Sequence, residues 1–280
     1  MPELPEVETI RAQLATALVG QRLCSIEALW PKSLETRGIL ASSCYDKPVE
    51  AVWRRGKMLG IALEGGISVL VHLRMTGQLL YLPVGSNQGA RQTTRVRMEF
   101  ASGDVLLFND QRKFGRVVVT KSSEVGSDGL LATMGPEALG AEFTSDVLKK
   151  AGKRHTKLAV KALILDQRVV AGVGNIYADE ALWTARIHPE RVCGTLSEAE
   201  WGALRDAIVA VLREGVVRGG STLRDYVDAA GQAGTYLEVA KVFARTGKPC
   251  LVCSTPVTKI RVAGRGTHLC TSCQVQEVAF

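Results

Sequence analysis

Two Cys-x-x-Cys sequences near the C-terminal end constrain this chain more than any other feature. Cys250 and Cys253 form the first pair, and Cys270 and Cys273 form the second after an interval of sixteen residues. A tight turn presents both thiolates of a pair to one ion, and four thiolates close a tetrahedral zinc site without leaving a position for water. The spacing therefore predicts one structural Zn²⁺, which folds a segment too short to have a core of its own.

The charge of the chain favours a polyanionic partner. Lys and Arg number 35 against 28 Asp and Glu, which gives a formal net charge of +7 over 280 residues. Residues 241–280 contain six basic side chains and one acidic side chain, so they stay positive when a zinc-tetrathiolate group adds about −2. A rigid, cationic hairpin is suited to binding phosphates, although a zinc ribbon that binds protein would share this cysteine spacing.

The N-terminal sequence is unlike a secretory signal. It reads Met-Pro-Glu-Leu-Pro-Glu, with neither a basic start nor an apolar run. No stretch reaches the roughly 18 apolar residues that span a bilayer. We therefore expect a cytoplasmic protein, and in that reducing compartment its seven cysteines favour metal binding over disulfides.

Hydrophobic periodicity changes from β-like to helical along the chain. Residues 4–20 predict a helix because Val7, Ile10, Leu14 and Leu18 recur on one face. Short β-like runs follow at 49–54, 59–63, 68–72, 95–100, 105–109 and 116–120. Their number and spacing are typical of an antiparallel sandwich. Three-to-four spacing of apolar residues then predicts helices at 158–165, 176–185 and 198–217.

These patterns predict an α+β fold. We expect an N-terminal antiparallel β-sandwich with an N-terminal helix over 1–130, a helical domain over 131–240 and a zinc-finger hairpin over 241–280. The first boundary should fall near residues 125–140. A glycine-rich segment, 219–234, follows the last long helix, and we expect it to be mobile.

Six separate motifs, in chain order, resemble those of the formamidopyrimidine-DNA glycosylase family. They are MPELPEVET at 1–9, RRGK at 54–57, DQRKFGR at 110–116, VGNIYADE at 173–180, GSTLRDY at 220–226 and GRGTH at 264–268. The resemblance implies a bacterial, nucleoid-associated base-excision repair enzyme. Such an enzyme removes oxidised purines (8-oxoguanine and formamidopyrimidines) from duplex DNA and cuts at abasic sites by β,δ-elimination. It also implies a helix-two-turn-helix element in the helical domain. Because the sequence shows no long apolar seam, we expect a monomer.

The resemblance assigns five catalytic residues. Removal of Met1 would expose Pro2 as a secondary amine, the nucleophile that forms a Schiff base. An α-amino group has a pKa of about 7.7–8.0, so much of it is neutral near pH 7, unlike a lysine. Glu3 would act as general acid–base, and Glu6 as a second carboxylate near the sugar. Lys57 would assist β-elimination and Arg265 δ-elimination. Without the resemblance, Pro2 and Glu6 would be interpreted as a helix-starting proline and a helix cap.

The resemblance also implies residues that bind DNA. Met75, Arg112 and Phe114 match a triad that fills the gap left by an everted base. Asn175, at a glycine-rich turn before a helix, matches a phosphate ligand, and His72 and Lys157 are assigned as further DNA contacts. The lesion-capping loop would supply Thr222, Arg224, Tyr226 and Tyr236.

This chain departs from the family pattern at three places. Arg74 stands where we expect glycine beside the wedge methionine, residues 87–94 lack a histidine, and 275–280 extend past the usual end. None of these places includes the nucleophile, so they bear on affinity and on the preferred opposite base.

Two other functions remain open at this stage. A sister enzyme that removes oxidised pyrimidines shares the proline, the lysine and the finger. Leu4 and the long loop 220–234 favour the purine enzyme. A non-catalytic zinc-ribbon protein that binds DNA would tolerate a blocked N-terminus, whereas the enzyme would not.

Overall fold

The computed structural model describes residues 1–127 and 129–276. It divides the chain into two compact units. The first comprises residues 1–133 and 218–235, and the second comprises 134–217 and 236–280. The part of the C-terminal extension at 277–280 lies outside the described residues. Among the helices of the described residues, none is both long and apolar enough to cross a membrane.

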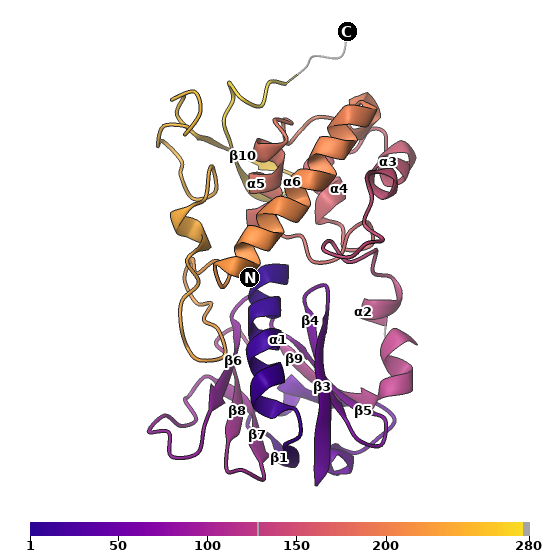
Figure 1. Ribbon diagram of the computed structural model, residues 1–280, viewed down its shortest axis with the longest axis vertical. Helices are drawn as coiled ribbons and strands as arrows, with labels where there is room; N and C mark the ends of the chain where they lie inside the picture. The colour runs from indigo at the N-terminus through magenta and orange to yellow at the C-terminus, as the bar shows by residue number, and fades with distance from the viewer. Residues whose placement is uncertain (128, 277–280) are drawn as a thin grey trace. The chain divides into compact units, whose positions relative to one another are not determined.

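Helix α1 (Leu4–Leu18) opens the first unit (Figure 1). Glu3 and Glu6 form a reciprocal capping box at its start, in which each side chain bonds the other residue's backbone N–H. The predicted apolar face is confirmed, because Val7, Ile10, Leu14 and Leu18 are buried.

The first unit is built on a nine-stranded sheet. In chain order its strands are β1 (Arg22–Ala28), β2 (Leu34–Thr36), β3 (Lys47–Arg55), β4 (Met58–Leu63), β5 (Ile67–His72), β6 (Gly77–Leu82), β7 (Thr94–Phe100), β8 (Val105–Asp110) and β9 (Arg116–Lys121). Their spatial order is β2-β9-β5-β4-β3-β1-β7-β8-β6. All pairs are antiparallel except β2 with β9.

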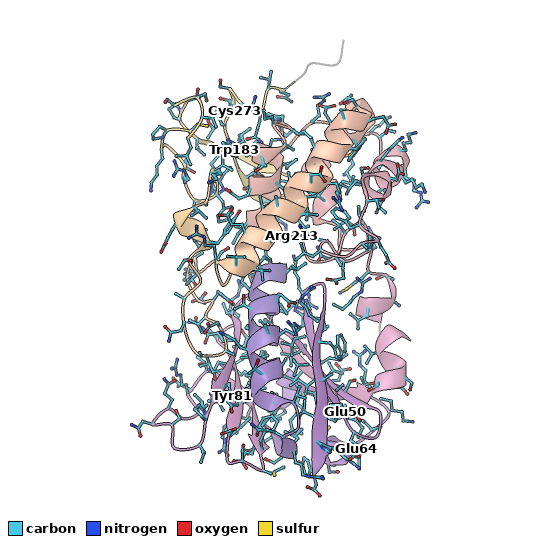
Figure 2. The ribbon with its side chains drawn as sticks, in the orientation of Figure 1. Glu50, Glu64, Tyr81, Trp183, Arg213 and Cys273 are labelled. Carbon is cyan, nitrogen blue, oxygen red and sulfur yellow. The ribbon has the colours of Figure 1, made fainter. Side chains whose placement is uncertain are left out.

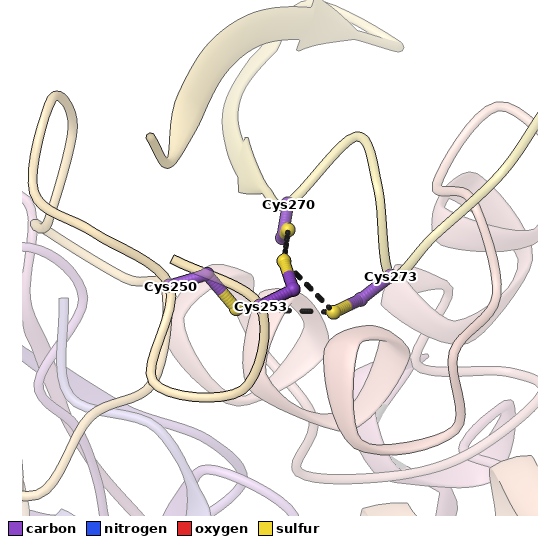
Figure 3. Close-up of side chains that lie close together, drawn as sticks. All are labelled: Cys250, Cys253, Cys270 and Cys273. Atoms are coloured by element: carbon purple, nitrogen blue, oxygen red, sulfur yellow. Dashed lines mark hydrogen bonds between the residues drawn. The ribbon is translucent and has the colours of Figure 1, made fainter. Parts of the chain in front are cut away.

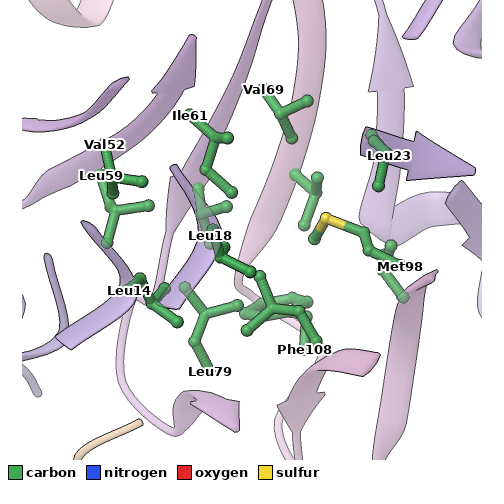
Figure 4. Close-up of a cluster of buried hydrophobic side chains, with 14 of the residues drawn as sticks. Leu14, Leu18, Leu23, Val52, Leu59, Ile61, Val69, Leu79, Met98 and Phe108 are labelled. Carbon is green, nitrogen blue, oxygen red and sulfur yellow. The ribbon is translucent and has the colours of Figure 1, made fainter. Parts of the chain in front are cut away.

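One hydrophobic core contains side chains from α1 and from strands on either side of β1 in the sheet. Val69 of β5 and Met98 of β7 belong to the same buried cluster as Leu14 and Leu18 of α1 (Figure 4). The sandwich prediction is therefore confirmed. Two 3₁₀ segments (Pro31–Ser33 and Ala41–Cys44) connect early strands, and Ser122–Ser127 and α2 (Gly129–Ala132) follow β9.

The second unit is helical with one hairpin. Its helices are α3 (Ser145–Arg154), α4 (Val160–Leu165), α5 (Asn175–Thr184) and α6 (Glu198–Val217), with 3₁₀ segments at Cys193–Thr195 and Tyr236–Glu238. Strands β10 (Thr258–Val262) and β11 (Arg265–Leu269) pair antiparallel. The three predicted helices are present, and α3 is an additional one.

Candidate functional site

The four cysteines of the two Cys-x-x-Cys pairs meet at one point (Figure 3). Their Sγ atoms all lie within 4.8 Å of one another. Cys250 and Cys273 are 3.8 Å apart, and Cys253 lies 3.3 Å from Cys270 and 3.6 Å from Cys273. Zn–S bonds of about 2.3 Å in a tetrahedron require S···S separations of about 3.8 Å. This donor set therefore fits one structural zinc ion.

The other three cysteines lie outside this cluster. Cys24 is exposed on β1, whereas Cys44 and Cys193 are buried. Burial raises the pKa of both Cys44 and Cys193 to about 11. These two thiols are therefore neutral near pH 7 and behave as core residues.

Arg265 stands at the tip of the zinc-finger hairpin. The two-residue turn before it, Ala263 and Gly264, has positive φ at both positions, 46° and 76°, as a type I′ hairpin turn requires. Arg265 is exposed and pairs with Val262 across the hairpin. The guanidinium is thus available to a phosphate, which is the role the sequence predicts for it.

A buried ion pair that the sequence did not reveal supports this hairpin. Lys161 of α4 and Asp179 of α5 are both 0% exposed, with Nζ 2.6 Å from Oδ1. Lys161 also donates to Thr267 Oγ1 at 2.7 Å. Asp179 Oδ2 accepts the backbone N–H of His268 at 2.8 Å. Two helices thereby hold β11 directly after Arg265.

Removing one partner of this pair should be costly. Lys161→Met leaves the Asp179 carboxylate charged and buried without its cation, and we expect a loss of about 3 kcal/mol in unfolding free energy. Adding Asp179→Asn removes the charge but keeps an acceptor for His268, so the double variant should recover more than half. Chemical denaturation of the zinc-loaded proteins measures both values. A loss below about 1 kcal/mol for Lys161→Met alone would contradict this account.

Glu180 forms a second buried anchor in this unit. Its carboxylate accepts backbone N–H groups of three successive residues, Lys241, Val242 and Phe243, at 2.8, 2.9 and 2.7 Å. Burial still raises its pKa, against the opposing effect of these hydrogen bonds. The chain that leads into the zinc finger is therefore fixed to α5.

The predicted phosphate site lies at a glycine-rich turn that leads into α5. Gly172 has φ +103° and Gly174 caps the helix, and the first N–H groups of a helix have no intrahelical acceptor. The Asn175 side chain donates to the carbonyl oxygen of Gly266 at 3.0 Å, so it also links α5 to the hairpin. Lys157 is exposed in the connection between α3 and α4.

In the first unit, the predicted catalytic residues at the N-terminus are buried. Pro2 is buried, and Glu3 and Glu6 are 2% and 1% exposed. Glu6 Oε2 accepts the Glu3 backbone N–H at 2.7 Å, while Oε1 accepts the N–H of Ser221 at 2.6 Å. Glu6 thus connects the start of α1 directly to the predicted lesion-capping segment.

Lys57 and His72 lie beside each other on the same sheet. Lys57 follows Gly56 (φ +56°) in the turn between β3 and β4, and the next residue, Met58, pairs with His72. Burial, followed by the charges of Arg74 and Lys57, lowers the pKa of His72 to about 4. His72 is therefore neutral near pH 7, and its Nδ1 accepts the Arg74 backbone N–H at 3.0 Å.

This depressed pKa gives a pH-dependent contribution to stability. The unfolded chain takes up a proton at His72 near pH 6.5, whereas the folded chain does so only near pH 4. The contribution is present above pH 6.5 and is lost as the pH falls towards 4. We expect His72→Asn to be less stable than the wild type at pH 7.5, with a smaller difference at pH 5. Urea midpoints at both values measure this, and an equal difference at both would contradict it.

The structure brings the three predicted wedge residues together at the surface. Met75 is 45% and Phe114 50% exposed, so neither belongs to the sandwich core. Arg112 Nη1 lies 3.0 Å from Met75 Sδ, and its Cζ lies 4.8 Å from the centre of the Phe114 ring. Arg74, before Met75, has φ +55°, a conformation that favours the glycine expected there.

Asp110 has a structural role at the wedge that the sequence did not indicate. Its side chain is 0% exposed at the end of β8. Oδ1 accepts from the Thr76 hydroxyl and the Arg112 N–H, and Oδ2 accepts from the Gly115 N–H at 2.6 Å. One carboxylate therefore shapes both loops of the wedge. The signals in the sequence were its place at the end of an apolar strand and at the start of the DQRKFGR motif.

The predicted lesion-loop residues do not all lie together. Thr222 Oγ1 donates to the Tyr226 carbonyl at 2.9 Å, and Arg224 is exposed. Tyr226 is buried, and burial together with Glu6 and Asp228 raises its pKa. Tyr236 belongs instead to the second unit, where it is 2% exposed and its ring centre is 4.8 Å from that of Tyr177.

Three family models match the chain in succession. They are the formamidopyrimidine-DNA glycosylase N-terminal domain over 1–117, the formamidopyrimidine-DNA glycosylase H2TH domain over 134–227, and a zinc finger found in FPG and IleRS over 247–275. The third match and the four-cysteine cluster confirm the prediction of one structural zinc.

Individual relatives match over almost their whole length. A formamidopyrimidine-DNA glycosylase of Herpetosiphon aurantiacus is 42% identical over 278 residues, 98% of this chain and 100% of the relative. One of Pelotomaculum thermopropionicum is 43% identical, over 98% and 99%. A variant Lactococcus lactis FPG in complex with Fapy-dG DNA has a TM-score of 0.90 at 34% identity, covering 98% and 100%. MutM (FPG) of Thermus thermophilus has a TM-score of 0.88 at 39% identity, covering 99% and 100%.

Proposed function

This chain belongs to the formamidopyrimidine-DNA glycosylase family, and from that premise we propose that it excises oxidised purines from duplex DNA and then cuts the strand. The substrates are 8-oxoguanine and formamidopyrimidines. A solved relative holds DNA that contains Fapy-dG. The observation that carries the proposal is the bond from Glu6 to Ser221, which links the buried N-terminus of α1 to the lesion-capping segment.

The proposed nucleophile is the amine of Pro2, set free when Met1 is removed. Its nitrogen attacks C1′ of the damaged nucleotide, the glycosidic bond breaks, and the base leaves with a proton supplied by an acid such as Glu3. The nitrogen loses its proton, and the C1′–O4′ bond opens as O4′ is protonated, which leaves an iminium at C1′. This iminium acidifies the C2′ hydrogen. Loss of that proton expels the 3′ phosphate, and a second elimination expels the 5′ phosphate. Covalent catalysis of this kind divides one difficult step into easier ones.

The remaining catalytic side chains position the reacting groups or neutralise the charge of the leaving phosphates. Glu6 holds the start of α1 and the lesion-capping segment next to each other, near the sugar. Lys57 neutralises the phosphate that leaves in β-elimination, and Arg265 does the same in δ-elimination. An arginine presents a rigid, always charged fork to a phosphate, and its place at an exposed hairpin tip supports this role.

DNA binding completes the proposal. Base eversion exposes C1′, and Met75, Arg112 and Phe114 fill the gap, with Arg112 facing the orphaned partner. His72, Lys157 and the turn at Asn175 contact the backbone. Thr222 and Arg224 enclose the everted base, and the buried Tyr226 anchors their segment to α1.

Each of the three parts of the chain has its own role in this proposal. Residues 1–130 hold the nucleophile and the wedge, 131–240 the helix-two-turn-helix element and the lesion loop, and 241–280 the zinc finger. We propose that the protein acts as a monomer on the chromosome in the bacterial cytoplasm, in association with the nucleoid.

Borohydride trapping tests the proposed function. Correctly processed protein is mixed with duplex DNA that holds one 8-oxoguanine opposite cytosine, and the iminium is reduced to a stable adduct. We expect an adduct and strand cutting. A non-catalytic zinc-ribbon protein would bind the duplex and give no adduct, which would refute the proposal. A duplex with thymine glycol serves as the second arm, and an adduct formed faster there would favour the pyrimidine enzyme.

A further inference from the structure

The segment 218–235 is attached to α1 at two places, one at Glu6 and one at Gln13. At the first attachment, the carboxylate of Glu6 accepts the Ser221 N–H, and the Tyr226 hydroxyl donates to the Glu6 carbonyl at 3.3 Å and to the Gly219 carbonyl at 3.1 Å. A Cβ atom on Gly220 would lie 2.8 Å from Cγ of Glu6. This attachment therefore requires close approach of the backbone.

Gln13 makes the second attachment, two helical turns further along α1. Its Oε1 accepts the Ala229 N–H at 2.9 Å, and its Nε2 donates to Asp228 Oδ2 at 2.7 Å. The Ala229 carbonyl accepts the Tyr81 N–H at 2.8 Å. Figure 2 shows Tyr81 on strand β6. Residues 228 and 229 are thus held by both the helix and the sheet.

Asp228 organises the turn that Gln13 holds. Its Oδ1 accepts the N–H groups of Ala230 and Gln232 at 3.0 and 2.7 Å, while Oδ2 faces Gln13. The polarities in this small cluster are complementary, because the Gln13 amide oxygen accepts an N–H and its amide nitrogen donates to a carboxylate.

Burial separates the segment into two parts. Tyr226 and Ala229 are 7% and 2% exposed and belong to the main core. Leu223 is 62% exposed, and Arg224 is also exposed. Between the two attachments, residues 222–225 are therefore neither in the core nor bonded to α1, although the Asp225 carbonyl accepts from the Gln78 side chain of β6.

We infer that Gln13 is a positioning residue for lesion capture. By fixing residues 228 and 229, it limits the movement of residues 222–225 and sets where those residues meet the everted base. This inference rests on the proposed function. It predicts an effect on base excision and none on cutting at a pre-formed abasic site, because an abasic site offers no base to enclose.

Exchanging the donor and the acceptor of the hydrogen bond between Gln13 and Asp228 tests the attachment. Gln13→Glu places a carboxylate against Asp228 and should lower the single-turnover rate of 8-oxoguanine excision about tenfold. Asp228→Asn places an amide nitrogen against the amide nitrogen of Gln13, with a similar result. In the double variant, the new Asn donates to the new Glu, which still accepts the Ala229 N–H. The double variant should therefore return to within about threefold of the wild type.

Two further readouts make the test specific. Cutting of a duplex with a pre-formed abasic site should stay within about twofold for all variants, and Thr16→Ala, an exposed change on α1, should alter neither activity. Hydrogen exchange at the amides of 229–232 should be faster in both single variants and normal in the double. This last readout needs no activity. If wild-type protein excises no base while the exchange pattern holds, the proposed function fails and the attachment stands.

Three results would overturn the inference. They are unchanged excision in Gln13→Glu, equal losses of excision and abasic-site cutting, and no recovery in the double variant.

Discussion

Protein that carries one additional glycine ahead of Pro2 is expected to lose adduct formation and strand cutting by at least about a thousandfold. The extension turns the Pro2 nitrogen into an amide, whose lone pair is delocalised into the carbonyl group. Such a nitrogen cannot attack C1′. The measurement is borohydride trapping on 8-oxoguanine DNA, run beside a cutting assay on abasic DNA.

The control for this prediction uses the same polypeptide. Proteolytic removal of the extension regenerates the Pro2 amine and should restore both activities. Affinity for a duplex with a tetrahydrofuran abasic analogue should change little in the blocked protein, since the DNA-contacting side chains remain. Strand cutting that survives the blocked amine would refute Pro2 as the nucleophile.

Removal of zinc is expected to have the second largest effect. Binding of structural zinc by small finger peptides is worth about 10–16 kcal/mol near pH 7, and residues 250–273 depend on it because they contain few buried apolar side chains. In Cys253→Ser, we expect bound zinc to fall below one ion per chain and affinity for the tetrahydrofuran duplex to fall about a hundredfold or more. Loss of the hairpin removes Arg265 and its neighbouring cations from the phosphates.

A matched cysteine variant separates this effect from general damage. Cys24→Ser removes an exposed thiol in β1, outside the cluster, and should retain both zinc and affinity. Hydrogen exchange of the first unit should be the same in the two variants. Full affinity in a zinc-free Cys253→Ser protein would contradict a supporting role for the metal.

The sequence predicted elements whose apolar pattern is regular. Helix α6 has the predicted bounds, 198–217, and α1 buries the predicted face. Strand β1 escaped prediction because a bulge between Leu23 and Ser25 interrupts its alternation. Strand β6 is buried on both faces at Leu79 and Leu80 and so lacks the two-residue period. The low apolar content of α3, with only Leu148 and Gly152 buried, hid its helical period.

For the site, prediction succeeded where the feature depends on local spacing. Two residues between cysteines sufficed for the zinc cluster, whereas the roles that the motifs assign to Pro2, Lys57 and Arg265 stay predictions. The residues that support the site could not be predicted from the sequence. Asp179 meets His268 across 89 positions, and Gln13 meets Asp228 across 215. Only the folded chain brings such pairs together, since neither partner lies in a pattern that indicates the other.

The discontinuity of the first unit bears on how the protein can be made and dissected. Its final segment, 218–235, supplies Ser221 to Glu6 and Tyr226 and Ala229 to the core. A nascent chain emerging from the ribosome therefore cannot complete this unit until residue 235 has been synthesised. A fragment that stops at 133 would expose an unfinished apolar surface and be prone to aggregate. An isolated version would need an artificial linker in place of 134–217.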